Sequence, residues 1–225
     1  MAQRQEGAYD HAMAHLYLSG GGFGVHSPAW PEALAWLASH RGEIGLASLA
    51  SDETRQAEML QAALAARGRI AHLIPLGDLG ESYSTIFLCG GDATRLASDP
   101  QRRAALERWL ARDDLTLVAD SAAAMAMGRR AASCTCGGHP IRVIDGLALL
   151  GDWSVLAHAS GPDDPRLTEL ADGQRSNSGH QLALPTCAAV EVLMDNGTVS
   201  LRSVAWSRVP VRLTARDDSQ SGSAA

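Results

Sequence analysis

Residues 115–128 read LTLVADSAAAMAMG: a hydrophobic run, then Ser121, then only alanines and methionines before a glycine. This pattern is typical of a nucleophile elbow, in which a strand turns sharply into a helix and its neighbours must be small. The free N–H groups of such a helix can stabilise an oxyanion. A serine here could also simply cap the helix, and Ala119 and Ala123 stand where the G-x-S-x-G pattern has glycines. We predict that Ser121 is a catalytic nucleophile.

On the N-terminal side, short apolar runs alternate with helical patterns. The apolar runs fall at residues 14–22, 43–51, 69–76 and 84–91, and the helical patterns start at Pro28, Asp52 and Asp92. We expect Asp52 to cap its helix, Gly68 to end it, and Pro100 to divide the third helical stretch. This alternation predicts an α/β fold, a three-layer sandwich with a mostly parallel sheet covered on both faces.

After Arg129 the pattern changes to short β-type runs, with Asn196-Gly197 as a hairpin turn. We expect these runs to add mixed or antiparallel strands to the sheet. Residues 12–214 read as a single domain, and residues 1–11 and 215–225 have the composition of flexible ends.

Composition excludes several classes of protein. The 225 residues are 46% hydrophobic with a net charge of −6, and the charges are scattered, which argues against nucleic-acid binding. No run has the character of a signal peptide or a membrane span, so we expect a cytoplasmic protein without a membrane partner. The cysteines are expected to be free thiols, and the segment CTCGGH at 134–139 lacks the second ligand pair of a zinc site. We therefore expect no metal and no cofactor.

Three further segments carry a family resemblance. FLCGGDATRL at 87–96, DSAAAM at 120–125 and GLALLGDWSVLAHAS at 146–160 follow one another in the order found in the peptidase E and cyanophycinase family of serine peptidases. The chain resembles that family from about residue 14 to 211, and the 37 positions between Ser121 and His158 are similar to the interval in its aspartyl dipeptidases. The resemblance implies a class I glutamine amidotransferase-like fold and a short peptide as substrate.

The resemblance also implies roles for individual residues. Ser121 would attack a carbonyl and His158 would take and return the proton, while the N–H groups of Gly91 and Ala122 would hold the oxyanion. Gly90 and Asp92, at the same strand end as Gly91, would contact substrate.

The third member of the triad is left open. The family's dipeptidases carry an acid about fifteen residues after the serine, but residues 129–138 contain no carboxylate. Glu191 is our first candidate, with Asp145 and Asp152 as alternatives, and a backbone carbonyl could also orient the histidine.

Substrate recognition departs from the family's aspartyl and cyanophycin specialists. Where these place several arginines, this chain keeps Arg166, which could clamp a peptide carboxylate or could be an ordinary surface arginine. The preceding GPDDP at 161–165 is acidic, so strict Asp-X specificity is not expected.

Two rival interpretations remain. A glutamine amidotransferase would use a cysteine nucleophile and a His-x-Glu pair, which Ser121 and His158-Ala159-Ser160 contradict. The other rival is an inactive relative that acts as a binding or assembly protein. We favour an exopeptidase or dipeptidase, with a homodimer left open.

Overall fold

The computed structural model describes residues 14–78, 81–133, 141–172, 179–195, 198–207 and 213–214. Both predicted flexible ends, the 134–139 cysteine segment and the Asn196-Gly197 turn lie outside these residues.

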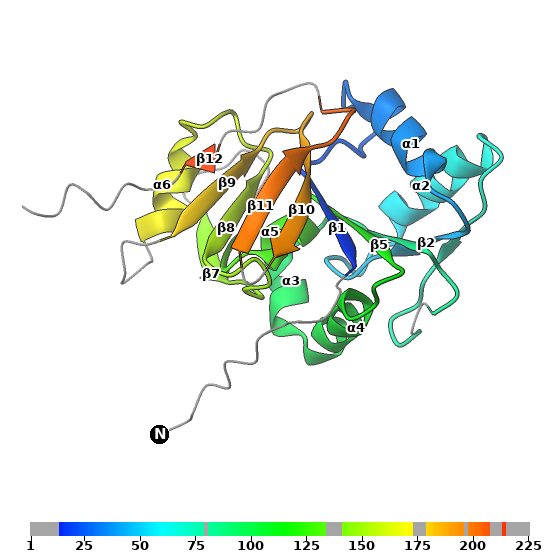
Figure 1. The fold of residues 1–225 in the computed structure, drawn as a ribbon, viewed down its shortest axis with the longest axis horizontal. Helices are drawn as coiled ribbons and strands as arrows, with labels where there is room; N and C mark the ends of the chain where they lie inside the picture. The colour runs from blue at the N-terminus through cyan, green and yellow to red at the C-terminus, as the bar shows by residue number, and fades with distance from the viewer. Residues whose placement is uncertain are drawn as a thin grey trace, which may run out of the picture.

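The centre of the structure is a seven-stranded sheet with the order β11-β10-β1-β5-β4-β2-β3 (Figure 1). Five neighbouring strands are parallel: β1 (His15–Ser19), β5 (Thr116–Asp120), β4 (Thr85–Leu88), β2 (Ile44–Ala47) and β3 (Ala71–Leu73). The antiparallel strands β10 (Ala189–Asp195) and β11 (Thr198–Ser203) extend the sheet beyond β1. The predicted mostly parallel sheet is confirmed.

Helices cover both faces of this sheet because its central strands are apolar on both sides. On β5, Leu117 and Ala119 join one buried cluster and Val118 joins the other. Helices α1 (Trp30–Ser39) and α2 (Arg55–Ala65) pack in the cluster of Val118, whereas the other cluster takes in α3 (Ala93–Ser98), α4 (Pro100–Leu110) and α5 (Ala122–Met127). The result is the three-layer sandwich that the alternating pattern predicted.

Two of the predicted helix boundaries meet different outcomes. Pro100 does divide its stretch: α3 ends at Ser98, and the Asp99 side chain accepts from the backbone of Gln101 at 2.8 Å as α4 begins. The expectation that Asp52 caps α2 was wrong, because the helix starts at Arg55 and Asp52 forms ion pairs with Arg95 and Arg102 instead.

The C-terminal third only partly joins the main sheet. Strands β6 (Arg130–Ser133) and β7 (Arg142–Asp145) form an antiparallel pair of their own. A separate three-stranded sheet contains β8 (Trp153–Ala157), β9 (His180–Leu184) and β12 (Leu213–Thr214), flanked by α6 (Pro165–Asp172). The end of β8 is tied to the end of β1, because the His158 N–H donates to the Gly20 carbonyl at 3.1 Å.

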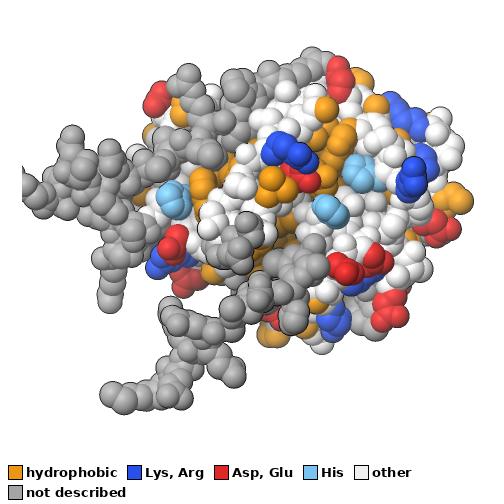
Figure 2. Space-filling model, viewed as in Figure 1, with side chains coloured by type: hydrophobic (Ala, Val, Ile, Leu, Met, Phe, Trp, Pro, Cys, Tyr) orange, Lys and Arg blue, Asp and Glu red, His pale blue; other side chains and the backbone are white. Residues whose placement is uncertain are grey.

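The molecular surface agrees with the scattered charges of the sequence. On the face shown in Figure 2, arginines and acids occur in small groups of both signs. Among the described helices, none is long and apolar enough to cross a bilayer.

Candidate functional site

Ser121 lies at the turn between β5 and α5, in a backbone conformation that side chains rarely adopt. Its φ is 54° and its ψ is −113°, and its N–H donates to the Ser19 carbonyl at 2.9 Å. The three following alanines are fully buried. The hydroxyl makes no capping hydrogen bond to α5, so the helix-cap interpretation of this serine is wrong. The turn presents the hydroxyl away from the helix, as a nucleophile elbow does.

His158, at the end of β8, is the hydrogen-bond partner of this hydroxyl. Ser121 Oγ lies 2.6 Å from His158 Nε2, within reach for proton transfer. Burial, followed by the charge of Arg166, holds the pKa of His158 below its usual 6.5. The imidazole is therefore mostly neutral at pH 7, and Nε2 can accept a proton.

The other nitrogen of His158 faces a hydroxyl. Its Nδ1 lies 3.3 Å from Thr186 Oγ1, on the loop between β9 and β10. Thr186 was not among the sequence candidates, since nothing in a lone loop threonine signals a role. A neutral threonine thus occupies the place where a triad has its acid.

The first candidate for that acid, Glu191, has other partners. Its buried carboxylate accepts from Tyr17 Oη at 3.2 Å and from Arg202 Nε at 2.8 Å, at the antiparallel end of the sheet. The alternative candidates are also engaged elsewhere: Asp145 pairs with Arg130 and Asp152 with Arg129. Among the described residues, none of the three orients His158, which corrects that expectation.

The predicted oxyanion donors lie on two chain segments beside Ser121. Within the described structure, neither the Gly91 nor the Ala122 N–H is bonded to a protein acceptor. Gly91 has φ of +149°, and an added Cβ would overlap the Ala50 carbonyl, so only glycine fits. A Cβ on Gly90 would lie 3.2 Å from that of Ser121, which shows how closely this strand end approaches the hydroxyl.

The two residues expected to contact substrate at this strand end have structural partners. The Gly90 N–H donates to Gln56 Oε1 at 2.7 Å. The Asp92 carboxylate caps α3 by accepting from the Thr94 N–H at 2.9 Å. Gly90 therefore contributes its lack of a side chain rather than its N–H, and Asp92 orients the helix.

Arg166 is buried and cannot serve as the predicted carboxylate clamp. Its side chain is 8% exposed and pairs with Asp164, while its Nη2 donates to the His158 carbonyl at 2.6 Å. The hydrogen bonds from Arg166 hold the pKa of Asp164 well below its usual range. The pair braces the loop after His158, and Asp164 adds no free negative charge near the serine. The repulsion expected from GPDDP is correspondingly reduced.

A buried acid next to the serine was also missed. Asp120 is 2% exposed and accepts from Ser19 Oγ at 2.7 Å and from Gln56 Nε2 at 3.0 Å. Burial raises its pKa to about 6, opposed by hydrogen bonds from Ser19, Gln56 and the N–H groups of Gly21 and Phe23. The sequence shows only that an aspartate precedes the serine, because its partners come from distant segments.

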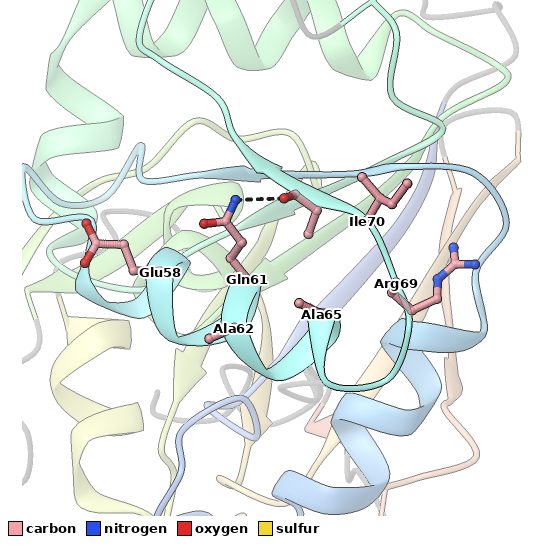
Figure 3. Close-up of a pocket in the computed structure, with 7 residues that line it drawn as sticks. Glu58, Gln61, Ala62, Ala65, Arg69 and Ile70 are labelled. Atoms are coloured by element: carbon pink, nitrogen blue, oxygen red, sulfur yellow. Dashed lines mark hydrogen bonds between the residues drawn. The ribbon is translucent and has the colours of Figure 1, made fainter.

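Other reactive groups and hollows lie outside this arrangement. Burial raises the pKa of the Cys89 thiol to about 12, so it is not a thiolate at neutral pH. The described residues contain no group of three that could hold a metal ion. A surface depression between α2 and β3, where Gln61 bonds to the Ala71 carbonyl, includes none of the predicted site residues (Figure 3).

Two solved structures with similar folds are peptidases by name. The match to a peptidase from an acI-B1 actinobacterium has a TM-score of 0.60 at 16% identity and covers 91% of this chain and 95% of the other. A protein from Listeria monocytogenes EGD-e that carries a provisional peptidase E name matches with a TM-score of 0.56 at 16% identity, over 86% and 100%. No family model and no curated protein matches the sequence. The chain has the expected peptidase E-like fold, and at this identity the likeness concerns the fold alone.

Gly21 offers a test of the geometry around His158. It has φ of +114°, and an added Cβ would overlap His158 Cε1, whereas Gly24 in the same loop has no neighbour within 4 Å of such an atom. We expect Gly21→Ala to push the imidazole toward solvent, so that its pKa moves back toward 6.5 in an NMR titration of the Cε1 proton. Gly24→Ala should titrate as wild type. An unchanged His158 signal in a folded Gly21→Ala protein would contradict the contact.

Proposed function

We propose that this chain, on its peptidase E-like fold, is a serine hydrolase that cleaves short peptides, with Ser121 as nucleophile and His158 as general base. The observation that carries the proposal is the 2.6 Å hydrogen bond from Ser121 Oγ to His158 Nε2, made from a strained strand-to-helix turn. Strain of this kind is costly and is found where function requires it.

The proposed reaction is acyl transfer in two steps. Ser121 Oγ attacks the carbonyl carbon while His158 Nε2 takes the hydroxyl proton, and the N–H groups of Gly91 and Ala122 bind the oxyanion. When the intermediate collapses, the C–N bond breaks and His158 protonates the departing amine. Water, deprotonated by His158, then attacks the ester carbonyl on Ser121; the ester C–O bond breaks, His158 returns the proton to Ser121 Oγ, and the acid product leaves.

Thr186 takes the orienting part in this scheme. When its hydroxyl accepts a hydrogen bond from the Nδ1–H, the lone pair of Nε2 faces Ser121, which is the tautomer that a general base needs. A hydroxyl supplies no negative charge to the imidazolium that forms during attack. Because no carboxylate among the described residues stabilises that imidazolium, we expect slower turnover than in enzymes with a full triad.

The alternative is an inactive binding or assembly protein on the same scaffold. The neutral partner of His158 and the alanines flanking Ser121 favour it. Against it stands the pairing of Ser121 with His158, because a structural serine does not need an imidazole at hydrogen-bond distance. The enzyme remains our first proposal.

Labelling with a fluorophosphonate tests the nucleophile without knowledge of the substrate. We expect the probe to modify wild type at Ser121, because attack on phosphorus needs the same base and oxyanion donors as acyl transfer. Ser121→Ala should lose labelling and peptide hydrolysis while unfolding at the wild-type temperature. Wild type that stays unlabelled and inactive across a broad peptide panel would favour the binding protein.

Thr186→Val removes one orienting hydrogen bond and keeps the side-chain shape. A net hydrogen bond of about 0.5–1.5 kcal/mol corresponds to roughly 2- to 12-fold slower labelling. Thr186→Ser, which keeps the hydroxyl, should label at close to the wild-type rate. Equal rates in the valine and serine variants would remove Thr186 from the scheme.

The burial of Arg166 bears on peptide specificity. Because that guanidinium is buried against Asp164 and the His158 carbonyl, we expect Asp-X dipeptides to be turned over no faster than matched Asn-X dipeptides. Comparing kcat/KM for Asp-Leu and Asn-Leu measures this, and a clear preference for Asp-Leu would contradict it. Unblocked, N-blocked and C-amidated versions of one peptide would then show which terminal charge is recognised.

A further inference from the structure

Asp120 is a buried carboxylate that the proposed reaction does not use. It lies at the last position of β5, and in the described structure no arginine or histidine pairs with it. An ionised carboxylate in such a place is stabilised only by hydrogen bonds, here from Ser19, Gln56 and the N–H groups of Gly21 and Phe23. Burying a carboxylate beside Ser121 costs free energy, and the hydrogen bonds of Asp120 indicate what it does there.

Through Ser19, Asp120 is connected to the turn after β1 that packs against the His158 ring. The Ser19 hydroxyl donates a hydrogen bond to Asp120 Oδ1 at 2.7 Å. The same oxygen accepts from the N–H groups of Gly21 and Gly22, each at 3.2 Å. Gly21 packs against the imidazole ring so closely that no side chain fits. The turn after β1 is therefore fixed through a hydroxyl whose direction Asp120 decides.

Through Gln56, Asp120 is also connected to the chain after β4 that carries Gly91, one of the proposed oxyanion donors. Gln56 Nε2 donates to Asp120 Oδ2 at 3.0 Å, which leaves Gln56 Oε1 to accept the Gly90 N–H at 2.7 Å. An amide has one donor end and one acceptor end, so if residue 120 stopped accepting, Gln56 could satisfy residue 120 or Gly90 but not both. The acceptor character of Asp120 thus determines how the chain before Gly91 is held.

We propose that Asp120 is a positioning residue of the hydrolytic site: by accepting from Ser19 and Gln56, it fixes the turn that seats His158 and the strand end that carries Gly91. This inference rests on the proposed function for its kinetic consequences, whereas the hydrogen-bond chain itself can be measured without any activity.

Protonation of Asp120 would break this arrangement, because the acid would become a donor on one oxygen. Ser19 on β1 and Gln56 on α2 do not titrate, and the titratable neighbours are Cys89 at the end of β4 and His158 across Ser121. The thiol of Cys89 stays neutral over the range of interest. Two groups must therefore lose a proton before the site is competent: Asp120, whose pKa burial raises to about 6, and His158, whose pKa burial and the charge of Arg166 hold below 6.5.

The test swaps the hydrogen-bond donor and acceptor between positions 120 and 56. In Asp120→Asn the new amide can still accept from Ser19, but its NH₂ meets the NH₂ of Gln56. Adding Gln56→Glu restores an acceptor, since a carboxylate at 56 accepts both from Asn at position 120 and from the Gly90 N–H. The exposed Asp113→Asn serves as the matched control for a lost carboxylate.

Fluorophosphonate labelling rates give the kinetic readout. We expect Asp120→Asn to label about 10- to 100-fold more slowly at pH 8, less than the roughly 10²- to 10³-fold loss on removing an oxyanion donor outright, because the Gly91 N–H would be displaced and not removed. The double variant should recover most of that loss, and Asp113→Asn should match wild type. At low pH the wild-type rate should fall with two protons and the Asp120→Asn rate with one. The inference would be overturned if Asp120→Asn labelled at the wild-type rate and its rate still fell with two protons at low pH. It would also be overturned if the double variant labelled no faster than Asp120→Asn.

Amide exchange of Gly90 gives the second readout, which needs no catalysis. We expect faster exchange in Asp120→Asn and slow exchange again in the double variant. If wild type is never labelled but Gly90 behaves in this way, the proposed function fails and the positioning of the strand end stands. If Asp120→Asn alone does not fold, a folded double variant that labels near the wild-type rate supports the inference, and one that labels no faster than Ser121→Ala overturns it.

Discussion

The backbone at Ser121 turns with φ of 54°, and the surrounding structure is arranged to hold it there. A conformation of this kind costs of the order of 1–3 kcal/mol for a residue with a side chain. The hydrogen bond from the Ser121 N–H to Ser19 ties the turn to the neighbouring strand, and α5 follows at once through buried alanines. Larger residues on α5 would meet β6 and β8, which pack against it. The elbow is thus possible only because its neighbours are small and its flanking strands are fixed.

Two buried aspartates near this turn show how environment decides what the same side chain does. Asp164 pairs with Arg166, its pKa falls, and the pair braces the loop of His158. Asp120 has no such cation, and burial raises its pKa from 3.8 to about 6. That rise corresponds to roughly 3 kcal/mol. Because the folded pKa lies above the unfolded one, Asp120 favours the fold most at low pH, and this contribution is lost as the pH rises through about 6.

Among the described residues, no carboxylate is hydrogen-bonded to the ring of His158. Thr186 can fix the tautomer of His158, but a neutral hydroxyl supplies no negative charge to the ring when it is protonated during acyl transfer. Burial and, to a smaller extent, the charge of Arg166 lower the pKa of the ring, which keeps it neutral and makes it a weaker base. The site is built for a histidine that is uncharged at rest.

The sequence by itself determined the alternation of apolar runs and helical patterns, and hence the parallel sheet with helices on both faces. It also determined Ser121 and its elbow, because small side chains after a strand are a local requirement of the turn. The pairing of Ser121 with His158 came from the order and interval of motifs.

What surrounds that pair was decided by tertiary structure alone. Glu191, Asp145 and Asp152 were reasonable acids by type, but strand register places Glu191 beside Arg202 and Asp145 beside Arg130, and the turn before β8 places Asp152 beside Arg129. Arg166 turned inward because Asp164 was buried beside it. Thr186, Gln56 and Ser19 came to the site from separate loops, helices and strands, and no local pattern distinguishes a hydroxyl or amide that will meet a histidine or a buried acid. Hydrogen bonds between residues far apart in the chain exist only once the strands pair, which is why the sequence could indicate the serine and its elbow while the fold had to supply its partners.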